Sequence, residues 1–139
     1  MRKFVHRLVT GALAAAAATG MALALGAAPA HAETNLTMVT RAGNGYAANG
    51  GGVFFNATGE IFTLYDQRSD GAGVNVSYYY RTPDNIWIYP ADLYYGGGAG
   101  SSKSFNKSIV DGSSVYIELC LIDSGDIKEA TCTSGVAVA

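Results

Sequence analysis

The sequence has few of the residues on which most enzyme active sites depend. Its only two histidines, His6 and His31, both lie before residue 33. From residue 33 onward the chain therefore lacks imidazole, the usual general base beside a serine or cysteine nucleophile and the commonest protein ligand of zinc. This absence argues against Ser-His-Asp and Cys-His mechanisms in that part of the chain.

Cysteine is equally scarce, with only Cys120 and Cys132. A catalytic thiol or a metal pair would need a partner, and the sequence offers no nearby histidine, no C-x-x-C motif and no third cysteine. An even number of cysteines in a short exported chain favours a disulfide. We predict a Cys120–Cys132 bridge and neither a metal site nor a cofactor.

Charged residues make up only 14% of the chain, and basic residues do not cluster. Residues 33–139 contain six basic and eleven acidic residues, a formal charge of −5. Nucleic acids and anionic membrane surfaces attract basic patches. We therefore expect neither of them as a partner.

The one long apolar run lies near the N-terminus. Arg2, Lys3 and Arg7 precede an Ala- and Leu-rich stretch over 8–28, which is followed by Pro29 and the small-residue sequence Ala30-His31-Ala32. This pattern predicts a secretory signal peptide over residues 1–32. A retained membrane anchor is the alternative, since the run is long enough to span a bilayer. With cleavage, we expect a secreted protein that keeps no membrane contact and has one domain, over 33–139.

No helical periodicity appears in that domain, where short runs of β-branched and aromatic residues alternate with turn residues. The pattern predicts an all-β fold, a small antiparallel Greek-key or immunoglobulin-like sandwich of about seven or eight strands. The Gly- and Asn-rich stretch 42–52 is predicted to be a mobile loop, and Asp111-Gly112 to be the turn of a hairpin. The expected strands are 36–41, 53–56, 60–66, 73–81, 86–89, 104–110, 114–123 and 127–132, with 135–139 as a further edge strand.

Alternation within two of these strands indicates which side chains face the core. In 73–81 the residues Val74, Val76, Tyr78 and Tyr80 fall on one apolar face, which leaves Tyr79 outward. In 114–123 the apolar face consists of Val115, Ile117, Leu119 and Leu121.

Aromatic residues are the strongest candidates for a binding surface. Exposed Tyr and Trp offer rigid contact area together with a polar group, which suits a protein partner or a sugar ring. The candidate binding residues are Tyr79, Trp87, Tyr94 and Tyr95. The alternative is that these aromatics build a core that is poor in Leu and Phe.

Three other patterns have simpler explanations. Residues 97–104 nearly match a phosphate-binding loop, but Ser102 replaces its second glycine, and strands are expected on both sides, which favours a connector. The aspartates Asp66, Asp70, Asp84 and Asp92 fall in or beside turns without calcium-loop spacing. A carboxylate pair such as Glu60 and Glu118 leaves a hydrolase open as a third reading.

Several of these segments resemble a group of small secreted proteins of Streptomyces-like actinobacteria, largely without known function. The Ala-rich leader, the segments 59–66 and 70–74, and the stretch from Asp111-Gly112 to Cys120 carry the resemblance. It implies an extracellular single-disulfide β-sandwich and no catalytic residues. The architecture is also similar to that of small β-sandwich amylase and protease inhibitors, although this chain lacks the Trp-Arg-Tyr triplet and second bridge of the amylase inhibitors.

Taken together, these observations predict a secreted, monomeric, non-enzymatic binding protein whose aromatic surface contacts an extracellular protein or glycan. The alternative is an inhibitor of an extracellular hydrolase, in which loop 82–85 or loop 94–102 enters the active site of the enzyme.

Overall fold

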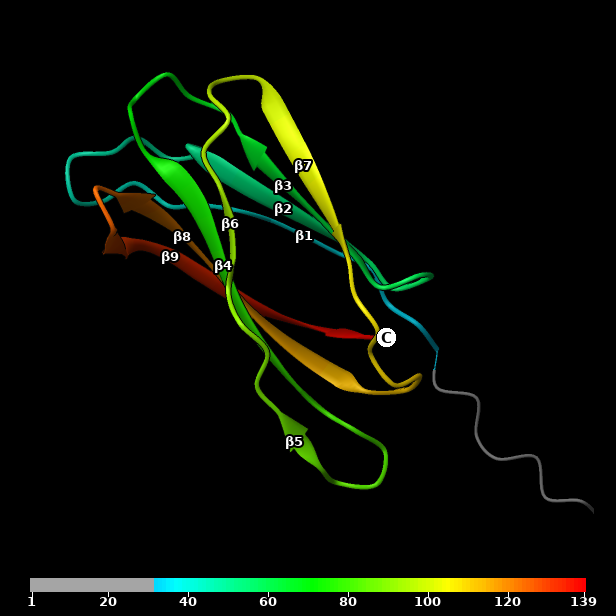
Figure 1. Ribbon diagram of the computed structural model, residues 1–139. Coiled ribbons are helices and arrows are strands. Elements are labelled where there is room, and N and C mark those ends of the chain that lie inside the picture. Colours follow the sequence, from blue (N-terminus) through cyan, green and yellow to red (C-terminus); the bar gives the residue numbers. More distant parts are fainter. Residues whose placement is uncertain (1–31) are drawn as a thin grey trace, which may run out of the picture.

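The computed structural model describes residues 32–139, and the predicted signal peptide lies almost entirely outside them. The described chain forms nine antiparallel strands and no helix (Figure 1). These are β1 (Leu36–Val39), β2 (Gly51–Asn56), β3 (Ile61–Asp66), β4 (Gly73–Arg81), β5 (Trp87–Ile88), β6 (Leu93–Tyr95), β7 (Ser101–Asn106), β8 (Ser114–Asp123) and β9 (Asp126–Val138).

The strands form two sheets that pack as a sandwich. One sheet has the order β1-β2-β3-β7, and the other has β5-β4-β8-β9, with β6 also paired to β4. β3 and β4 follow each other in sequence but lie in different sheets, while β7 returns beside β3 and β8 beside β4. This connectivity confirms the predicted Greek-key, immunoglobulin-like sandwich.

The core lies between the sheets and follows the predicted alternation. Val74, Val76, Tyr78 and Tyr80 of β4 are buried, as are Val115, Ile117, Leu119 and Leu121 of β8. Phe62 of the first sheet lies between Phe55 and Tyr78, with ring centroids 4.6 and 4.7 Å away, so the aromatic core joins the two sheets. Burying the Tyr78 ring raises the pKa of its phenol above 10.0.

The prediction of a hairpin at Asp111-Gly112 is wrong. Residues 110–113 do turn, with Gly112 at a φ of 77° and Ser113 N donating to Val110 O at 3.0 Å, but the turn joins strands of different sheets. β7 pairs with β3, where Phe105 lies opposite the buried Phe62. The turn residues specify a local bend, whereas burial of Phe105 against the core decides which strand β7 joins.

The structure has nine strands, close to the seven or eight predicted, but two parts of the chain differ from expectation. β6 was not expected, and the segments 127–132 and 135–139 are parts of one strand, β9, which pairs with β8 throughout except at an irregularity near Leu119 and Leu121. There residues 129–132 of β9 bulge opposite Cys120. A bulge redirects a strand without ending it, so alternation read from the sequence breaks at that point.

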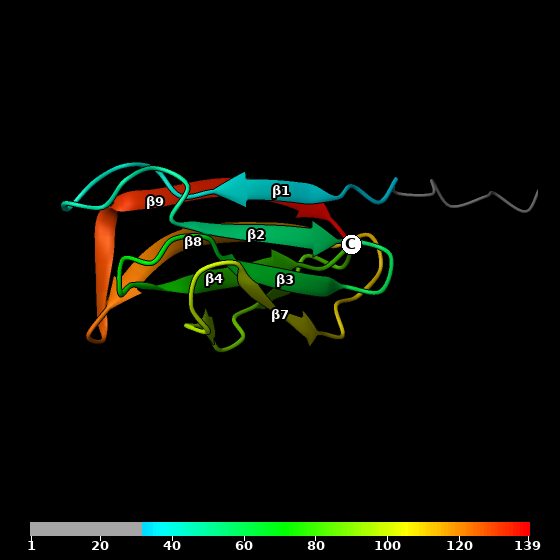
Figure 2. The ribbon, with the colours of Figure 1, turned by 90° about the horizontal axis from the view of Figure 1, so that it is seen from above.

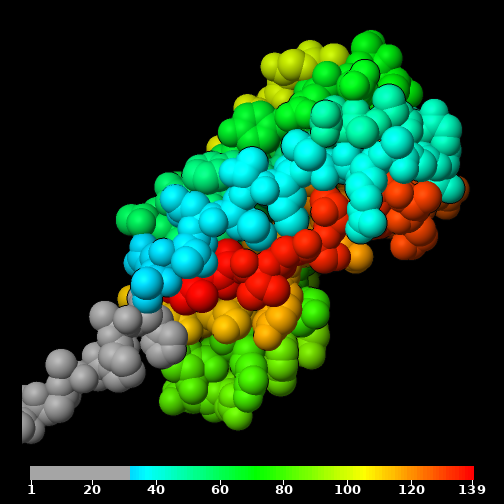
Figure 3. Space-filling model, turned by 180° about the vertical axis from the view of Figure 1, so that it is seen from behind, coloured from blue at the N-terminus to red at the C-terminus, as the bar shows by residue number. Residues whose placement is uncertain are grey.

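β1 closes one side of the sandwich by lying against β9 (Figures 2 and 3). Thr34 N donates to Val138 O at 2.9 Å, and Arg41 N donates to Thr131 O at 3.0 Å. The stretch predicted as a mobile loop is held down, because Ala130 N donates to Asn44 Oδ1 at 2.9 Å and Gly51 already belongs to β2.

Candidate functional site

Four aromatic side chains gather on the outer face of the five-stranded sheet, and we call Tyr79, Trp87, Tyr89 and Tyr116 the aromatic cluster. Tyr79 stacks on Tyr116 with ring centroids 5.0 Å apart and planes 7° apart. Its centroid is also 5.8 Å from that of Trp87 and 5.7 Å from that of Tyr89. Trp87 in turn lies 5.6 Å from Tyr116. These are contact distances for aromatic pairs, so the four rings form one surface.

Strand register explains why the rings meet. Tyr79 and Tyr116 are directly opposite each other in the β4–β8 ladder, and each alternates with inward-facing residues. Trp87 is opposite Arg81 in the short β4–β5 pair, and Tyr89 follows just after β5. Opposite residues on one sheet face lie close enough for their side chains to touch.

Exposure distinguishes this cluster from the aromatic core. Tyr79 is 40% exposed, Trp87 43% and Tyr89 73%, while Tyr78 and Tyr80 are buried. Exposed Val136, opposite Tyr116, adds apolar surface on the same face, while the exposed Ile86 and Ile88 flank Trp87 on the hairpin. The β4–β5 hairpin that carries most of this surface projects beyond the body of the sandwich (Figures 1 and 3).

A groove of about 290 Å³ lies next to the cluster on its β8–β9 side. Tyr79 and Tyr116 line one part of it, and Val136 of β9, the register neighbour of Tyr116, lines another. Its polar lining comes from Glu118 and Ser134. This volume is at the lower end of the range for ligand pockets, so the groove has room for a single ring or side chain of a larger ligand.

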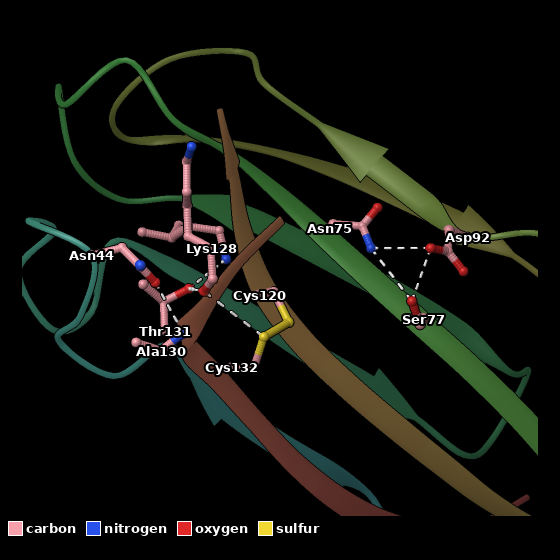
Figure 4. Close-up of a disulfide and its surroundings, with 10 residues drawn as sticks. Asn44, Asn75, Ser77, Asp92, Cys120, Lys128, Ala130, Thr131 and Cys132 are labelled. Atoms are coloured by element: carbon pink, nitrogen blue, oxygen red, sulfur yellow. Dashed lines mark hydrogen bonds between the residues drawn. A yellow bond between two sulfur atoms is a disulfide. The ribbon is translucent and has the colours of Figure 1, made fainter. Parts of the chain in front are cut away.

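A row of polar residues runs beside the aromatic cluster, and we call Ser77, Glu118 and Ser134 the polar row. Ser77 is opposite Glu118, and Glu118 is opposite Ser134, so the row crosses β4, β8 and β9. Asp92 extends it, because Ser77 Oγ donates to Asp92 Oδ2 at 2.8 Å (Figure 4). Asn75 Nδ2 also donates to this carboxylate oxygen, at 3.1 Å.

A basic side chain borders the opposite side of the cluster. The guanidinium carbon of Arg81 lies 5.7 Å from the centroid of the Trp87 ring, a cation–π distance. The aromatic cluster therefore has a cation along one side and carboxylates along the other.

The structure brings together only two of the four predicted binding residues, Tyr79 and Trp87. Tyr94 and Tyr95 belong to β6, where they pair with Asn75 and Val74 near the other end of β4. Tyr94 is exposed, but Tyr95 packs against the core. These two tyrosines do not join the aromatic cluster.

Sequence reasoning missed Tyr89 and Tyr116 as binding candidates. Tyr116 lies on the face of its strand opposite the apolar one, but its place in the cluster depends on the pairing of β8 with β4. That pairing is between strands more than 30 residues apart, so only the shared outward alternation of Tyr79 and Tyr116 would have suggested it.

The predicted disulfide is present, with Cys120 and Cys132 bonded and their Cα atoms 4.2 Å apart. The two sulfurs and a carboxylate oxygen of Glu118 all lie within 4.8 Å of one another. Three such groups resemble a metal site, but sulfurs bonded to each other are not the thiolates that metals bind. The bridge instead fixes the bulge of β9 to β8 (Figure 4).

The two loops predicted as inhibitory lie at different places. Loop 82–85 forms the tip of the projecting hairpin and is braced by Thr82 N donating to Ile86 O at 2.9 Å. Loop 94–102 is tied to the buried Asp66, whose Oδ2 accepts from Gly98 N at 3.0 Å and whose backbone oxygen accepts from Gly100 N at 2.8 Å.

Comparison with protein-family models, curated proteins and solved structures found no match to this chain. The resemblance to small secreted actinobacterial proteins therefore remains a prediction. Across residues 32–139, no helix has the length and apolar character needed to cross a bilayer.

Proposed function

We propose that this protein is an exported, non-enzymatic binding protein that holds a saccharide chain on the outer face of its five-stranded sheet. The observation that carries this proposal is the contact among four aromatic rings on that face, of which Tyr79, Trp87 and Tyr89 are exposed and Tyr116 is half-buried. Clustered surface aromatics of this kind are more typical of interaction sites than of an unused surface, where apolar side chains occur singly.

The chemistry of the surface favours a sugar. The faces of a sugar ring carry C–H groups that pack on aromatic rings, while its rim carries hydroxyl groups that need hydrogen-bond partners. The aromatic cluster supplies the rings, and Ser77, Glu118 and Asp92 supply acceptors beside them. The adjoining groove accommodates one sugar unit of the saccharide, and the neighbouring sugar units would pack on the exposed rings.

Export is supported by the disulfide, since such bonds persist in oxidising compartments. Glu33, which directly follows the predicted cleavage site, already contacts the sandwich, since Thr58 Oγ1 donates to Glu33 Oε2 at 2.8 Å. We expect the intact mass of the secreted product to correspond to a chain that begins at Glu33.

Binding is tested by co-sedimentation with insoluble cellulose, chitin, deacetylated chitin and bacterial cell wall. We expect the protein to sediment with at least one, and Trp87→Ala to weaken that binding by about thirtyfold, the effect of losing an interface hot spot. Tyr65→Ala is the matched control, because Tyr65 is similarly exposed (37%) but lies on the other sheet.

The same variants separate binding from folding. Trp87→Ala should lower the free energy of unfolding by less than the roughly 3–5 kcal/mol that a buried aromatic residue would cost, because the Trp87 ring is 43% exposed. Equal binding by Trp87→Ala and wild type would refute the proposal. Self-association that Trp87→Ala abolishes would assign the surface to a second copy, and release of reducing sugar would indicate a hydrolase.

One observation favours a second candidate, inhibition of an extracellular hydrolase. The β4–β5 hairpin projects from the body of the sandwich, and a hydrogen bond from Thr82 N to Ile86 O holds its tip. The Ile86 side chain at this tip is 56% exposed. A rigid projecting loop with an apolar tip suits insertion into a cleft. Inhibition of a secreted amylase or serine protease that Ile86→Ser relieves would support this candidate over sugar binding.

A further inference from the structure

We propose that the saccharide bound by the aromatic cluster carries a protonated amine, which the polar row recognises through Glu118. This inference rests on the proposed function and concerns the same surface. It identifies the ligand as an amino sugar with a free amine, as distinct from a neutral, acetylated or acidic sugar.

The negative charge in the groove favours an amine. Glu118 lines it and is exposed. Its register neighbours are Ser77 and Ser134, and its neighbours on the same face of β8 are Tyr116 and Cys120, so no basic side chain occupies these adjoining positions.

A second carboxylate adds to the negative charge of the row. Asp92 is held by hydrogen bonds from Ser77 Oγ at 2.8 Å and Asn75 Nδ2 at 3.1 Å, and Ser77 is directly opposite Glu118. Both acids thus lie along one edge of the aromatic cluster. An acidic sugar would be repelled there, and a neutral one would gain only hydrogen bonds.

The aromatic rings favour the same ligand. A ring substituent that reaches Glu118 from the groove passes Tyr116, because the two residues are two positions apart on one face of β8. An ammonium group within about 6 Å of a tyrosine ring is attracted by the π-system. Arg81, the cation in contact with the cluster, lies across it against Trp87, away from the polar row.

Three β-1,4-linked pentasaccharides test the inference because they share a backbone and differ only at carbon 2. These are the pentamers of glucosamine, N-acetylglucosamine and glucose. Trp87 is the only tryptophan of the chain, so its fluorescence reports binding at the cluster. The titrations are run at about pH 5.5, above the usual pKa of a glutamate and with the sugar amines protonated.

We expect the glucosamine pentamer to bind about fivefold more tightly than the other two, the scale of one exposed ion pair. Glu118→Gln should reduce that preference to less than about twofold, because the amide keeps a hydrogen-bond acceptor but loses the charge. Salt at about 1 M should have the same effect, because it shortens the Debye length to about 3 Å and so weakens the attraction between exposed charges. Glu33→Gln makes the same change of charge outside the groove and should keep the preference.

The outcomes separate this inference from the proposed function. Equal binding of all three pentamers, or a preference that survives Glu118→Gln, would overturn the amine but leave saccharide binding in place. Binding of none of them, together with Trp87-dependent sedimentation on another polysaccharide, would also overturn only the amine. Failure to bind any pentamer or polysaccharide would overturn both.

Discussion

Tyr79 shows how a single position couples core and surface. Its neighbours Tyr78 and Tyr80 are buried, with exposed fractions of 5% and 8%, so strand alternation forces Tyr79 to the outer face. There its ring contacts three other aromatic rings. The run of three tyrosines therefore serves two purposes, since Tyr78 and Tyr80 fill the core and Tyr79, between them, forms part of the candidate site.

A second residue-scale feature is the hydrogen bond that ties loop 41–50 to the end of β8. Tyr46 Oη donates to Asp123 Oδ2 at 2.7 Å. This bond, helped by one from Ser124, lowers the pKa of Asp123 below 3.8. The same bond, helped by burial, raises the pKa of Tyr46 above 10.0.

These pKa shifts predict how the bond contributes to stability. A carboxylate with a lowered folded-state pKa stabilises the fold above its unfolded pKa, and that contribution is lost as pH falls through the folded value. A tyrosine with a raised pKa stabilises below its unfolded pKa, and its contribution is lost as pH rises through the folded value.

We therefore expect Tyr46→Phe to lower the thermal midpoint between about pH 5 and 9, with the difference from wild type narrowing below about pH 4 and above about pH 10. Thermal scans of both proteins across this range provide the measurement. A difference as large at about pH 2 as at neutral pH would show that the bond does not depend on the Asp123 carboxylate.

At the scale of elements, the disulfide and the bulge of β9 act together. The bridge joins residues 12 positions apart, and beside it Leu121 N donates to Thr131 Oγ1 at 3.0 Å. The backbone oxygen of Thr131 also accepts from Arg41 N, which lies just after β1. The bulge therefore connects β8 to the β1 end of the other sheet. Both cysteines are nearly inaccessible to solvent.

Replacing both cysteines by alanine should lower the free energy of unfolding by about 3 kcal/mol, the chain-entropy cost of a loop of this size. Urea denaturation measures the change. Hydrogen exchange should show that the amides of Arg41 and Ala130 lose protection first, since both bond to partners across this junction. Uniform loss of protection over all nine strands would contradict this local role for the bridge.

Prediction from the sequence succeeded for elements whose signal is local. The run of β-branched and aromatic residues located β3, and alternation located β4 and β8 together with their core-facing residues. It failed where long-range packing decides the outcome. β7 pairs with β3, where Phe105 lies opposite Phe62, and not with β8 as the expected hairpin would require. The aromatic cluster forms only because β8 pairs with β4.

On the scale of the whole molecule, the two outer faces differ in character. The outer face of the five-stranded sheet holds the aromatic cluster, the groove and the polar row. The outer face of the other sheet exposes Val39 and Tyr65 among hydroxyl residues such as Thr63 and Ser104, which bond to each other at 2.9 Å. We assign binding to the first face alone.

The most direct test of this assignment is a ¹H–¹⁵N correlation spectrum recorded while the glucosamine pentamer is added to the protein. The account predicts that the largest shift changes fall on the amides of Tyr79, Trp87, Tyr116 and Val136 and on the indole N–H of Trp87. Tyr65 and Val39, on the opposite face, should remain unaffected. Changes centred on the opposite face, or confined to the hairpin tip at 82–85, would contradict the central claim that the aromatic cluster binds the ligand.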